Sequence, residues 1–455
     1  MSLDRRHFLT YSAAGAATAA DPFASQRAVA APLSVLGIDA LHFGVRAGSP
    51  DDQSRPLQNA IDQAAGARVP LVLGPGVYRA GDLRLPAGAQ IVGVRGATRL
   101  MFTQGPSLVS AHRADLVGLT GLVLDGGGRA LPEGRGLVHF VSGRGVRVTD
   151  CDIAGAGRQG IVLEQIEGEI TGSTVSDAAD AAIFARDSRG LMIARNTVRA
   201  AGNNGIQVWR SEPGDDGTLI IDNRIEGVLA RAGGSGQNGN GINVFRAANV
   251  VVQGNRIRSC AFSAIRGNAA SNLQMIANNC TGLNEVALYA EFGFEGALIA
   301  NNVVDGAAIG VAVTNFKQGG RLAVVQGNVI RNLLPKRPAG TDPGDGAGIG
   351  IGVEADSTVT GNIVENAPYA GISVGFGQYL RDVAVTGNVV RTAAVGIAVS
   401  VTSGAGTAVI ADNLIAGTQR GAIVGMERQK QVTGDLAADG AARFAHLAIS
   451  GNRVR

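Results

Sequence analysis

The sequence predicts an all-β fold: a right-handed single-stranded parallel β-helix, or solenoid, with a short N-terminal capping helix. From about residue 150 it repeats an Asn-x-Val/Ile segment followed by a Gly-Ile-x-Val segment, as in Asn196–Val198 and Gly205–Val208. Apolar residues alternate with other residues in these segments, and a period of two is typical of strands. Repeats of about 22 to 26 residues are too small to bury their own apolar side chains, so neighbouring repeats must stack.

A column of asparagines marks one turn of each repeat, and Cys151 and Ser173 take its place in two earlier repeats. Asn tolerates the left-handed backbone conformation, and stacked Asn side chains can hydrogen-bond from coil to coil. We therefore interpret the column as architecture and predict an asparagine ladder without a ligand role. Its members are Asn196, Asn223, Asn255, Asn279, Asn302, Asn328, Asn362, Asn388, Asn413 and Asn452.

The first thirty residues differ in character from the rest. Arg5 and Arg6 precede Phe8 and Leu9, then a weakly apolar stretch follows and an Ala-Val-Ala run ends the segment. This order indicates a twin-arginine signal peptide over residues 1–30, whose apolar part is too short to cross a bilayer. We expect a periplasmic or secreted protein carried by the twin-arginine export machinery, with no stable membrane span.

Residues 31–100 form a predicted N-terminal cap, and residues 101–455 form the predicted β-helix repeats. Within the cap, Leu57, Ala60 and Ile61 fall on one face of a helix. An open β-helix end exposes strand edges and core, so a plug of this kind is physically required.

The segment 43–94 is similar to the opening of pectate-lyase-like right-handed β-helix proteins. The similarity rests on Phe43-Gly44, the acidic pair Asp51-Asp52, the helix at Leu57–Asp62 and the strand with a Pro-Gly turn at Leu71–Tyr78. It implies a fold and leaves the chemistry to be argued from a site. With its signal and repeats, the chain resembles an uncharacterised family of twin-arginine-translocated β-helix repeat proteins, which supplies no catalytic residues to transfer.

The repeat pattern breaks near the C-terminus, where Met426–Ala445 inserts charged residues before one last strand. The sequence has no recognisable C-terminal cap. Either this excursion or another subunit covers the edge of the last coil. The oligomeric state stays open at this point.

Composition excludes some classes of function. Forty basic and 37 acidic residues give a net charge of +3, which is no footprint of a nucleic-acid-binding protein. Three cysteines and five histidines without clustering predict no metal site, and we expect no cofactor. Cys260 and Cys280 lie about one coil apart and could pair, but export of a folded chain from a reducing compartment predicts stability without that bond.

Strand alternation assigns the outward residues of each coil. In every Gly-Ile-x-Val strand the Ile and Val point inward, while x and the residue after Val point to solvent. The first outward row is Val162, Phe184, Gln207, Asn243, Arg266, Tyr289, Ala312, Gly352, Ser373, Ala398 and Ile423. The second is Glu164, Arg186, Trp209, Phe245, Asn268, Glu291, Thr314, Glu354, Gly375, Ser400 and Gly425. Coils 160–291 mix aromatics, arginines, amides and acids, whereas later coils present mostly small residues.

The face of coils 160–291 is predicted to bind a polysaccharide or oligosaccharide. Aromatic rings pack on the C–H faces of sugars, and amides and guanidinium groups bind hydroxyls and carboxylates. The segments 211–217 and 231–240 adjoin this face and are expected to wall a groove. The alternative is an ordinary solvated sheet. The candidate substrate-binding residues are Gln207, Trp209, Arg210, Asn243, Phe245 and Arg246.

Arg266, Tyr289 and Glu291 on adjacent coils are the candidate catalytic residues. Proton abstraction beside a uronate carboxylate needs a base and a cationic neutraliser, which these groups can supply. Stacking at about 4.8 Å puts Glu164 roughly 24 Å from Glu291, too far for a hydrolase pair. The predicted function is binding or modification of an acidic polysaccharide, of lyase or epimerase type if catalytic. The alternative is a non-catalytic structural or carbohydrate-binding scaffold in the periplasm.

Overall fold

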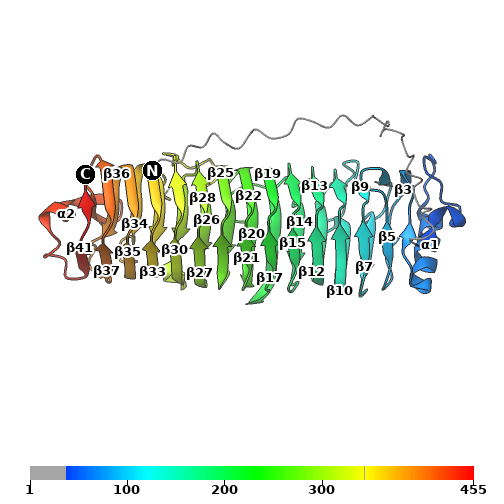
Figure 1. The fold of residues 1–455 in the computed structure, drawn as a ribbon, viewed down its shortest axis with the longest axis horizontal. Helices are drawn as coiled ribbons and strands as arrows, with labels where there is room; N and C mark the ends of the chain where they lie inside the picture. Colours follow the sequence, from blue (N-terminus) through cyan, green and yellow to red (C-terminus); the bar gives the residue numbers. More distant parts are fainter. Residues whose placement is uncertain (1–36, 343) are drawn as a thin grey trace, which may run out of the picture.

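The structure, a computed structural model, describes residues 37–342 and 344–455. The predicted export signal, with Arg5, Arg6, Phe8 and Leu9, lies outside these residues. Figure 1 shows coils stacked into an elongated parallel β-helix, with helix α1 (Ser54–Ala67) at one end and α2 (Leu436–Asp439) at the other. Within the described ranges, no helix is long and apolar enough to cross a membrane.

Each coil contributes to three sheets, and the first sheet carries the Gly-Ile-x-Val segments. Its strands pair in parallel, apart from the antiparallel pairing of β39 (Ile423–Glu427) with β40 (Lys430–Asp435) at the C-terminal end. The other strands of the first sheet are β4 (Leu83–Arg84), β7 (Val109–His112), β10 (Gly136–Thr149), β12 (Gln159–Thr171), β14 (Ile183–Arg186), β17 (Asn204–Asp215), β20 (Asn240–Ala248), β23 (Ile265–Asn268), β26 (Val286–Glu291), β29 (Ile309–Val313), β32 (Ile349–Val353), β34 (Ile363–Val374) and β36 (Val389–Ser400).

The second and third sheets meet at the asparagine turn. Long strands bend around corners, so β10 and β12 also join the second sheet, and β34 and β36 also join the third. The second sheet contains β1 (Ile38–Asp39), β2 (Leu71–Val72), β5 (Gln90–Val92), β8 (Gly118–Thr120), β15 (Met192–Ala194), β18 (Leu219–Ile221), β21 (Val251–Gln253), β24 (Leu273–Ile276), β27 (Glu295–Ala300), β30 (Arg321–Gln326), β33 (Ala355–Thr360), β35 (Arg381–Thr386), β37 (Ala408–Ala411) and β41 (Leu447–Ser450). The third contains β3 (Gly76–Ala80), β6 (Thr98–Phe102), β9 (Val123–Asp125), β11 (Asp152–Ala154), β13 (Thr174–Ser176), β16 (Thr197–Arg199), β19 (Arg224–Val228), β22 (Arg256–Cys260), β25 (Asn279–Leu283), β28 (Val303–Asp305), β31 (Val329–Arg331), β38 (Leu414–Thr418) and β42 (Arg453–Val454). Short 3₁₀ helices occupy Ala40–Phe43 and Phe316–Gln318.

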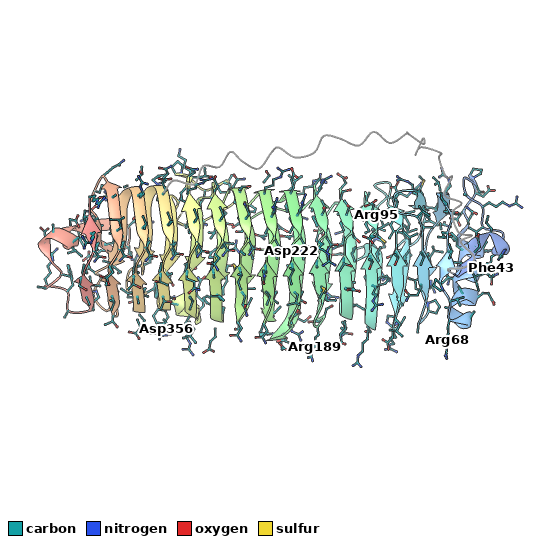
Figure 2. All side chains as sticks on the ribbon, viewed as in Figure 1. Phe43, Arg68, Arg95, Arg189, Asp222 and Asp356 are labelled. Carbon is teal, nitrogen blue, oxygen red and sulfur yellow. The ribbon has the colours of Figure 1, made fainter. Side chains whose placement is uncertain are left out.

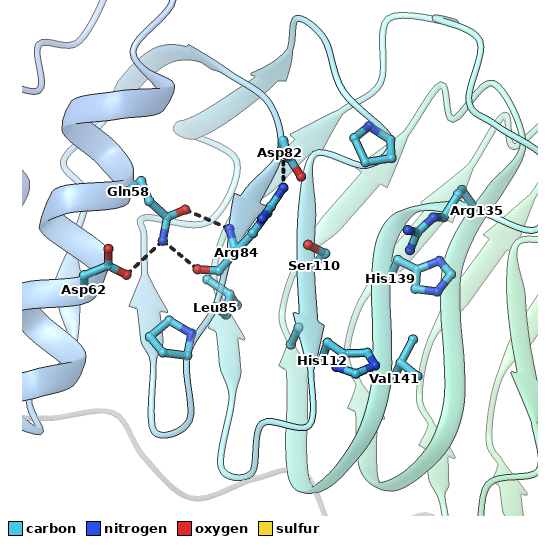
Figure 3. Close-up of a pocket in the computed structure, with 13 residues that line it drawn as sticks. Gln58, Asp62, Asp82, Arg84, Leu85, Ser110, His112, Arg135, His139 and Val141 are labelled. Atoms are coloured by element: carbon cyan, nitrogen blue, oxygen red, sulfur yellow. Dashed lines mark hydrogen bonds and ion pairs between the residues drawn. The ribbon is translucent and has the colours of Figure 1, made fainter.

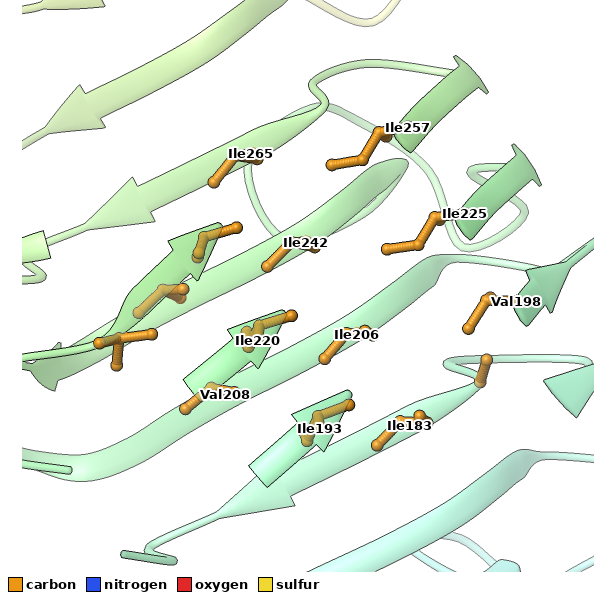
Figure 4. Packing of buried hydrophobic residues seen from close by; sticks show 14 of the residues in the cluster. Ile183, Ile193, Val198, Ile206, Val208, Ile220, Ile225, Ile242, Ile257 and Ile265 are labelled. Atoms are coloured by element: carbon orange, nitrogen blue, oxygen red, sulfur yellow. The ribbon is translucent and has the colours of Figure 1, made fainter. Parts of the chain in front are cut away.

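The core is a column of aliphatic side chains that all three sheets supply. Ile206 and Val208 of the first sheet, Ile220 of the second and Ile225 of the third are each at most 1% exposed. Figure 4 shows these side chains pointing toward one another across the interior. Burying each such side chain contributes about 1.5 to 3 kcal/mol. The predicted inward direction of the Ile and Val positions is therefore confirmed.

The asparagine ladder is present and runs along the corner between the second and third sheets. The Oδ1 atom of Asn255 accepts hydrogen bonds from the backbone N–H and from the side-chain amide of Asn223, both at 2.9 Å. Its own Nδ2 donates to the backbone oxygen of Ile220 at 2.9 Å. Cys151 and Ser173 hold the equivalent positions in the earlier coils, as predicted. From Cys151 onward, the ladder thus ties each coil to the next at the same corner.

Two details of the ladder prediction were wrong. The ladder uses Asn278, which is 1% exposed and bonds to Asn302, whereas Asn279 is exposed on the first position of β25. In addition, the left-handed conformation belongs to the residue before each ladder asparagine, such as Asp222 with φ 56° or Gly254 with φ 68°. The turn is therefore made by the preceding residue, and the asparagine is selected for its amide.

Both ends of the stack are covered by the chain itself. At the N-terminal end, Leu57, Ala60 and Ile61 of α1 face the core, as the sequence predicts. At the C-terminal end, Leu436 of α2 is 3% exposed and packs on the core. The Asp435 carboxylate accepts hydrogen bonds from two backbone N–H groups of the last first-sheet strand. The sequence left open whether the 426–445 excursion or another subunit covers the last coil, and the excursion does cover it.

The three cysteines are buried and unpaired. Burial raises the pKa of Cys151 to about 11 and that of Cys260 to about 12. Cys280 shifts in the same direction because of its burial. These thiols therefore pack as small apolar groups within the core.

Candidate functional site

The first sheet has one register along the stack, so its outward side chains form two continuous rows. Figure 2 shows outward side chains along the whole length of the molecule. The pairings Phe184 with Gln207 and Arg186 with Trp209 agree with the predicted rows. The last coil does not: Val424 pairs with Ala398 and Met426 with Ser400, one residue beyond the predicted Ile423 and Gly425. The prediction was displaced by one residue here, because Ile423 is the inward residue of the strand and pairs with Ile397.

Three aromatic rings on successive coils form a strip, which we call the aromatic strip. The rings of Phe184 and Trp209 lie 5.4 Å apart edge to face, and those of Trp209 and Phe245 lie 5.6 Å apart. Each ring is half-buried. The guanidinium of Arg246 lies 4.8 Å from the centre of the Phe245 ring. The strip is therefore an apolar surface whose rings are inclined to one another, with a cation at one end.

The loop at 231–240 covers part of the face that was predicted to be open. Asn243 donates from Nδ2 to the oxygen of Gly236 in this loop at 3.0 Å, and its Oδ1 accepts the Trp209 indole N–H at 2.8 Å. Asn243 is 3% exposed and Gln207 is 7% exposed. The prediction that both amides face solvent was wrong, because the loop folds over the strand. Asn243 instead orients the Trp209 ring.

The segment 211–217 continues strand β17 instead of forming a separate wall. Arg246 donates from one terminal nitrogen to the oxygen of Ser211 at 2.8 Å. The side chain of Arg210 lies along this segment, 4.0 Å from the buried carboxylate of Asp216. Burial raises the pKa of Asp216. Both arginines therefore fix the edge of the sheet beside the aromatic strip.

The three predicted catalytic residues lie together, and each already has partners. Arg266 binds both carboxylate oxygens of Glu291, at 2.6 and 2.8 Å, and contacts Glu285 at 3.2 Å. Arg266 is 7% and Glu291 2% exposed. The Arg266 guanidinium also lies 4.7 Å from the centre of the Tyr289 ring. Burial raises the pKa of Tyr289 to about 12. A catalytic role for these residues stays a prediction. The expectation that they face solvent was wrong for Arg266 and Glu291, whereas Tyr289 is half-buried.

A second loop, which precedes β32, joins this buried network. Arg337 donates to the Glu285 carboxylate at 3.1 Å and to the oxygen of Gly346 at 2.7 Å. This loop meets the 231–240 loop, where the N–H of Ser235 donates to the oxygen of Gly340. Glu285 is 1% exposed, and burial raises its pKa. The carboxylate thus sits between two guanidinium groups that hold the loops over the middle of the face.

An open groove lies at the N-terminal end of the same face, and Figure 3 shows it in close-up. It has a volume of about 500 Å³. Helix α1 forms one side, because Gln58 bonds to the backbone N–H and oxygen of Arg84 at 2.8 and 2.7 Å. The groove is lined by Gln58, Asp62, Asp82, Arg84, Leu85, Pro86, Pro106, Ser110, Ala111, His112, Arg135, His139 and Val141.

His139 lies in this groove as a neutral imidazole. Burial lowers its pKa to about 4, and Arg135 adds to this effect while Glu164 opposes it. The N–H of Gly136 donates to Nδ1 at 3.4 Å, so the proton of the neutral ring is on Nε2. Nε2 lies 3.8 Å from Glu164, whose other oxygen accepts from Arg186 at 2.8 Å. His112, one coil earlier, is exposed.

The sequence-based rows missed this groove, although the same register reaches it. Ser110 pairs with His139, and His139 pairs with Val162, so the first outward row continues upstream for two coils. The second row continues likewise through Val141 to His112. These early strands lack the Gly-Ile-x-Val pattern. Counting back one coil from Val162 leads to His139, and counting back two coils from Glu164 leads through Val141 to His112.

Two family models match parts of the chain. Residues 213–390 match the model described as right handed beta helix region, and residues 120–236 match the model described as periplasmic copper-binding protein (NosD). The first match confirms the predicted right-handed parallel β-helix. No curated protein matches the chain. The closer likenesses predicted from the sequence, to pectate-lyase-like proteins and to the twin-arginine-translocated family, stay predictions.

Solved structures share the fold at low sequence identity. The N-terminal fragment of bacteriophage phi29 gene product 12 has a TM-score of 0.51 and 15% identity, covering 86% of this chain and 69% of that chain. The pre-mature form of the same phage protein has a TM-score of 0.50 and 15% identity, covering 87% and 56%. The catalytic unit of an alpha-1,3-glucanase from Streptomyces thermodiastaticus has a TM-score of 0.48 and 13% identity, covering 91% and 68%. At such identity only the fold is shown.

The residues matched by the copper-binding description do not fit a copper site. This stretch holds one histidine, one cysteine and one methionine: His139, Cys151 and Met192. Cys151 points into the core, His139 lies on the first sheet and Met192 on the second, so the three cannot share an ion. Across residues 37–342 and 344–455, no group of three or more His, Cys, Asp or Glu side chains is placed to hold a metal.

Proposed function

We propose that this protein is exported and binds an extended acidic polysaccharide along the N-terminal half of the first sheet. The bound chain runs from the groove at His112 and His139 to the aromatic strip of Phe184, Trp209 and Phe245. The main support is that the groove and the aromatic strip lie on the same two outward rows of the first sheet. The aromatic faces pack on sugar C–H surfaces by apolar contact.

The charges along this path favour an anionic polymer. Arg84 and Arg135 line the groove, Arg186 lies between the groove and the strip, and Arg246 lies over the strip's last ring. Guanidinium groups bind carboxylates with two parallel hydrogen bonds. Arg84 and Arg186 are exposed, and their present partners, Asp82 and Glu164, are surface carboxylates. Surface ion pairs of this kind contribute less than about 1 kcal/mol, so a ligand carboxylate can replace them.

The length of the path favours a polymer over a single sugar. From β7 to β20 there are five steps between adjacent coils, and each step spans about 4.8 Å. The path is therefore roughly 24 Å long. A chain of several sugar units fits this length.

A second function, lyase or epimerase chemistry, is favoured by one observation. The groove brings an exposed imidazole, His112, within one coil of the neutral His139 and between Arg84 and Arg135. In this proposal His112 takes the proton beside a uronate carboxylate, the two arginines neutralise that carboxylate, and His139 shapes the floor. In this case Arg266, Tyr289 and Glu291 have a structural role and support the part of the face that the loops cover.

Binding is tested by measuring the affinity of the mature chain for polygalacturonate and for neutral dextran. Trp209→Ala is expected to weaken polygalacturonate binding roughly tenfold, because the central ring of the strip is lost. Trp209→Phe keeps a flat ring and is expected to retain most of the affinity. Phe376→Ala removes an exposed ring away from the strip and is the matched control. Equal affinity of parent and Trp209→Ala, with unchanged thermal unfolding, would contradict the proposal.

Turnover is measured separately, by the ultraviolet absorbance of unsaturated sugar products and by the stereochemistry of the recovered polymer. Loss of turnover in His112→Ala, with binding retained, supports chemistry in the groove. Loss in Arg266→Ala or Tyr289→Phe, at unchanged thermal stability, supports the trio predicted from the sequence. Binding without turnover in the parent leaves the protein as a carbohydrate-binding module.

A further inference from the structure

A basic groove lies on the third sheet, away from the face described above. It has a volume of about 490 Å³ and is formed by the outer sides of β16, β19, β22 and β25. No aromatic side chain lines it. The lining side chains that point outward are Thr197, Arg199, Arg224, Glu226, Arg256, Arg258, Asn279 and Thr281. Four arginines and one glutamate leave three positive charges without a partner inside the groove.

Strand register fixes how these arginines are spaced. Arg224 pairs directly with Arg256 on the next coil, and Glu226 pairs with Arg258. Adjacent coils are about 4.8 Å apart, so the two like-charged guanidinium groups are held side by side. Ile225 and Ile257, which follow these two arginines in their strands, point into the core, and Figure 4 shows both packed against the other sheets. The arginines therefore cannot turn inward and stay exposed.

Placing like charges opposite each other on a sheet is destabilising. Glu226 relieves part of this repulsion, because one oxygen lies 2.6 Å from Arg258. Both side chains of that pair are largely exposed, so the pair adds little stability. Arg199 lies opposite Glu226 in the register, on the side away from Arg258, while Arg224 and Arg256 form no ion pair with a carboxylate of the described residues. An anion in the groove would remove the repulsion that the fold leaves in place.

The groove takes its arginines from three successive coils of the third sheet. The equivalent positions are Thr174 and Ser176 one coil upstream, and Asn279 and Thr281 one coil downstream. On the next two coils, Asp305 of β28 and Arg331 of β31 form an ordinary ion pair. The same three coils carry the aromatic strip on the first sheet. On later coils of this sheet Arg331 and Arg391 lie opposite Asp305 and Glu365, whereas in the groove Arg224 lies opposite Arg256.

We propose that this groove is a separate binding site for an acidic polysaccharide, which presents carboxylate or sulfate groups to Arg199, Arg224, Arg256 and Arg258. Thr197, Asn279 and Thr281 at its ends bind the hydroxyls. The lack of aromatic rings disfavours single-stranded nucleic acid, which binds largely by base stacking. The site does not depend on the proposed function of the first sheet, because it uses a different sheet and different side chains.

The test uses the full chain carrying Trp209→Ala, so that binding at the aromatic strip is weakened in every sample. Arg224→Ala/Arg256→Ala is compared with Arg331→Ala/Arg391→Ala, which removes two arginines from later coils of the same sheet. Affinities for polygalacturonate, dextran sulfate, neutral dextran and a single-stranded oligonucleotide are measured at two salt concentrations.

The groove pair is expected to lose roughly tenfold in affinity for both acidic polymers and to show a weaker salt dependence, because two charge contacts are gone. The control pair is expected to bind like its parent. Equal losses in the two pairs would assign binding to overall charge and overturn the site. So would no loss in the groove pair, or tighter binding of the oligonucleotide than of either polymer. Unchanged thermal unfolding shows that the groove variants are folded.

Discussion

The two halves of the first sheet share a backbone and differ in what they present. In coils 136–291 the outward rows carry His139, Trp209 and Arg266, whereas in coils 309–400 they carry mostly Gly, Ala and Ser. The inward rows do not change between the halves, since Ile206 and Ile372 are both fully buried. A solenoid thus separates scaffold from surface, because each outward position can vary without disturbing its neighbours in the core.

The largest expected difference between the halves comes from one outward carboxylate in each. Glu291→Ala breaks the bidentate pair with Arg266 and leaves the buried guanidinium with Glu285 at 3.2 Å as its remaining carboxylate partner, which is expected to cost about 3 to 5 kcal/mol in the free energy of unfolding. Glu354 lies on the same row in the second half and accepts a single N–H from Phe316. Glu354→Ala is expected to cost about 1 to 3 kcal/mol. Denaturant unfolding of both variants checks this, and equal costs would contradict the contrast.

The ladder should show no difference between the halves. Asn255→Ala and Asn388→Ala each remove a side chain that satisfies a buried backbone N–H of the preceding coil. Both are expected to lower the free energy of unfolding by about 2 to 4 kcal/mol. Asn279→Ala, at the exposed neighbouring position, is expected to change it by less than about 0.5 kcal/mol. A much smaller cost in the second half would show that the scaffold itself is uneven.

The pH dependence of stability should reveal the buried histidine of the first half. His139 binds a proton near its usual pKa of about 6.5 when unfolded, and only near 4 when folded. The unfolded state therefore binds more protons between these values, and stability falls as the pH drops from 6.5 to 4. His139→Gln removes this contribution, which is at most roughly 3 kcal/mol. Thermal unfolding of parent and variant across this range measures it, and parallel curves would rule it out.

The smallest expected effect is the coupling within the aromatic strip. A double-mutant cycle of Phe184→Leu and Trp209→Leu is expected to give about 0.5 to 1.5 kcal/mol, since their rings lie 5.4 Å apart edge to face. A cycle of Trp209→Leu with Ala398→Gly, on a distant coil, is expected to give none within error. Equal coupling energies in the two cycles would mean that the strip is not a local unit.

Much of the fold can be predicted from the sequence, because the repeat acts locally. The inward Ile and Val positions, the ladder and the α1 face all follow from spacing. The errors are single-residue shifts at places where the pattern fades: Asn278 replaces Asn279, and Val424 replaces Ile423. Register is set by pairing between coils. Where two asparagines are adjacent or a strand is irregular, the local sequence does not determine which residue pairs with the neighbouring coil.

The sequence by itself determined the right-handed parallel β-helix and the face with the most varied side chains. Only the tertiary structure decided which of those side chains remain accessible. Loops from separate coils fold over Asn243 and Arg266, and the latter forms a buried ion network with Glu285 and Arg337. Alternation shows whether a residue points out of the coil. Asn243 is covered by a loop only 7 residues away, whereas Arg337 reaches Glu285 from 52 residues away, and neither contact follows from the alternation within a strand.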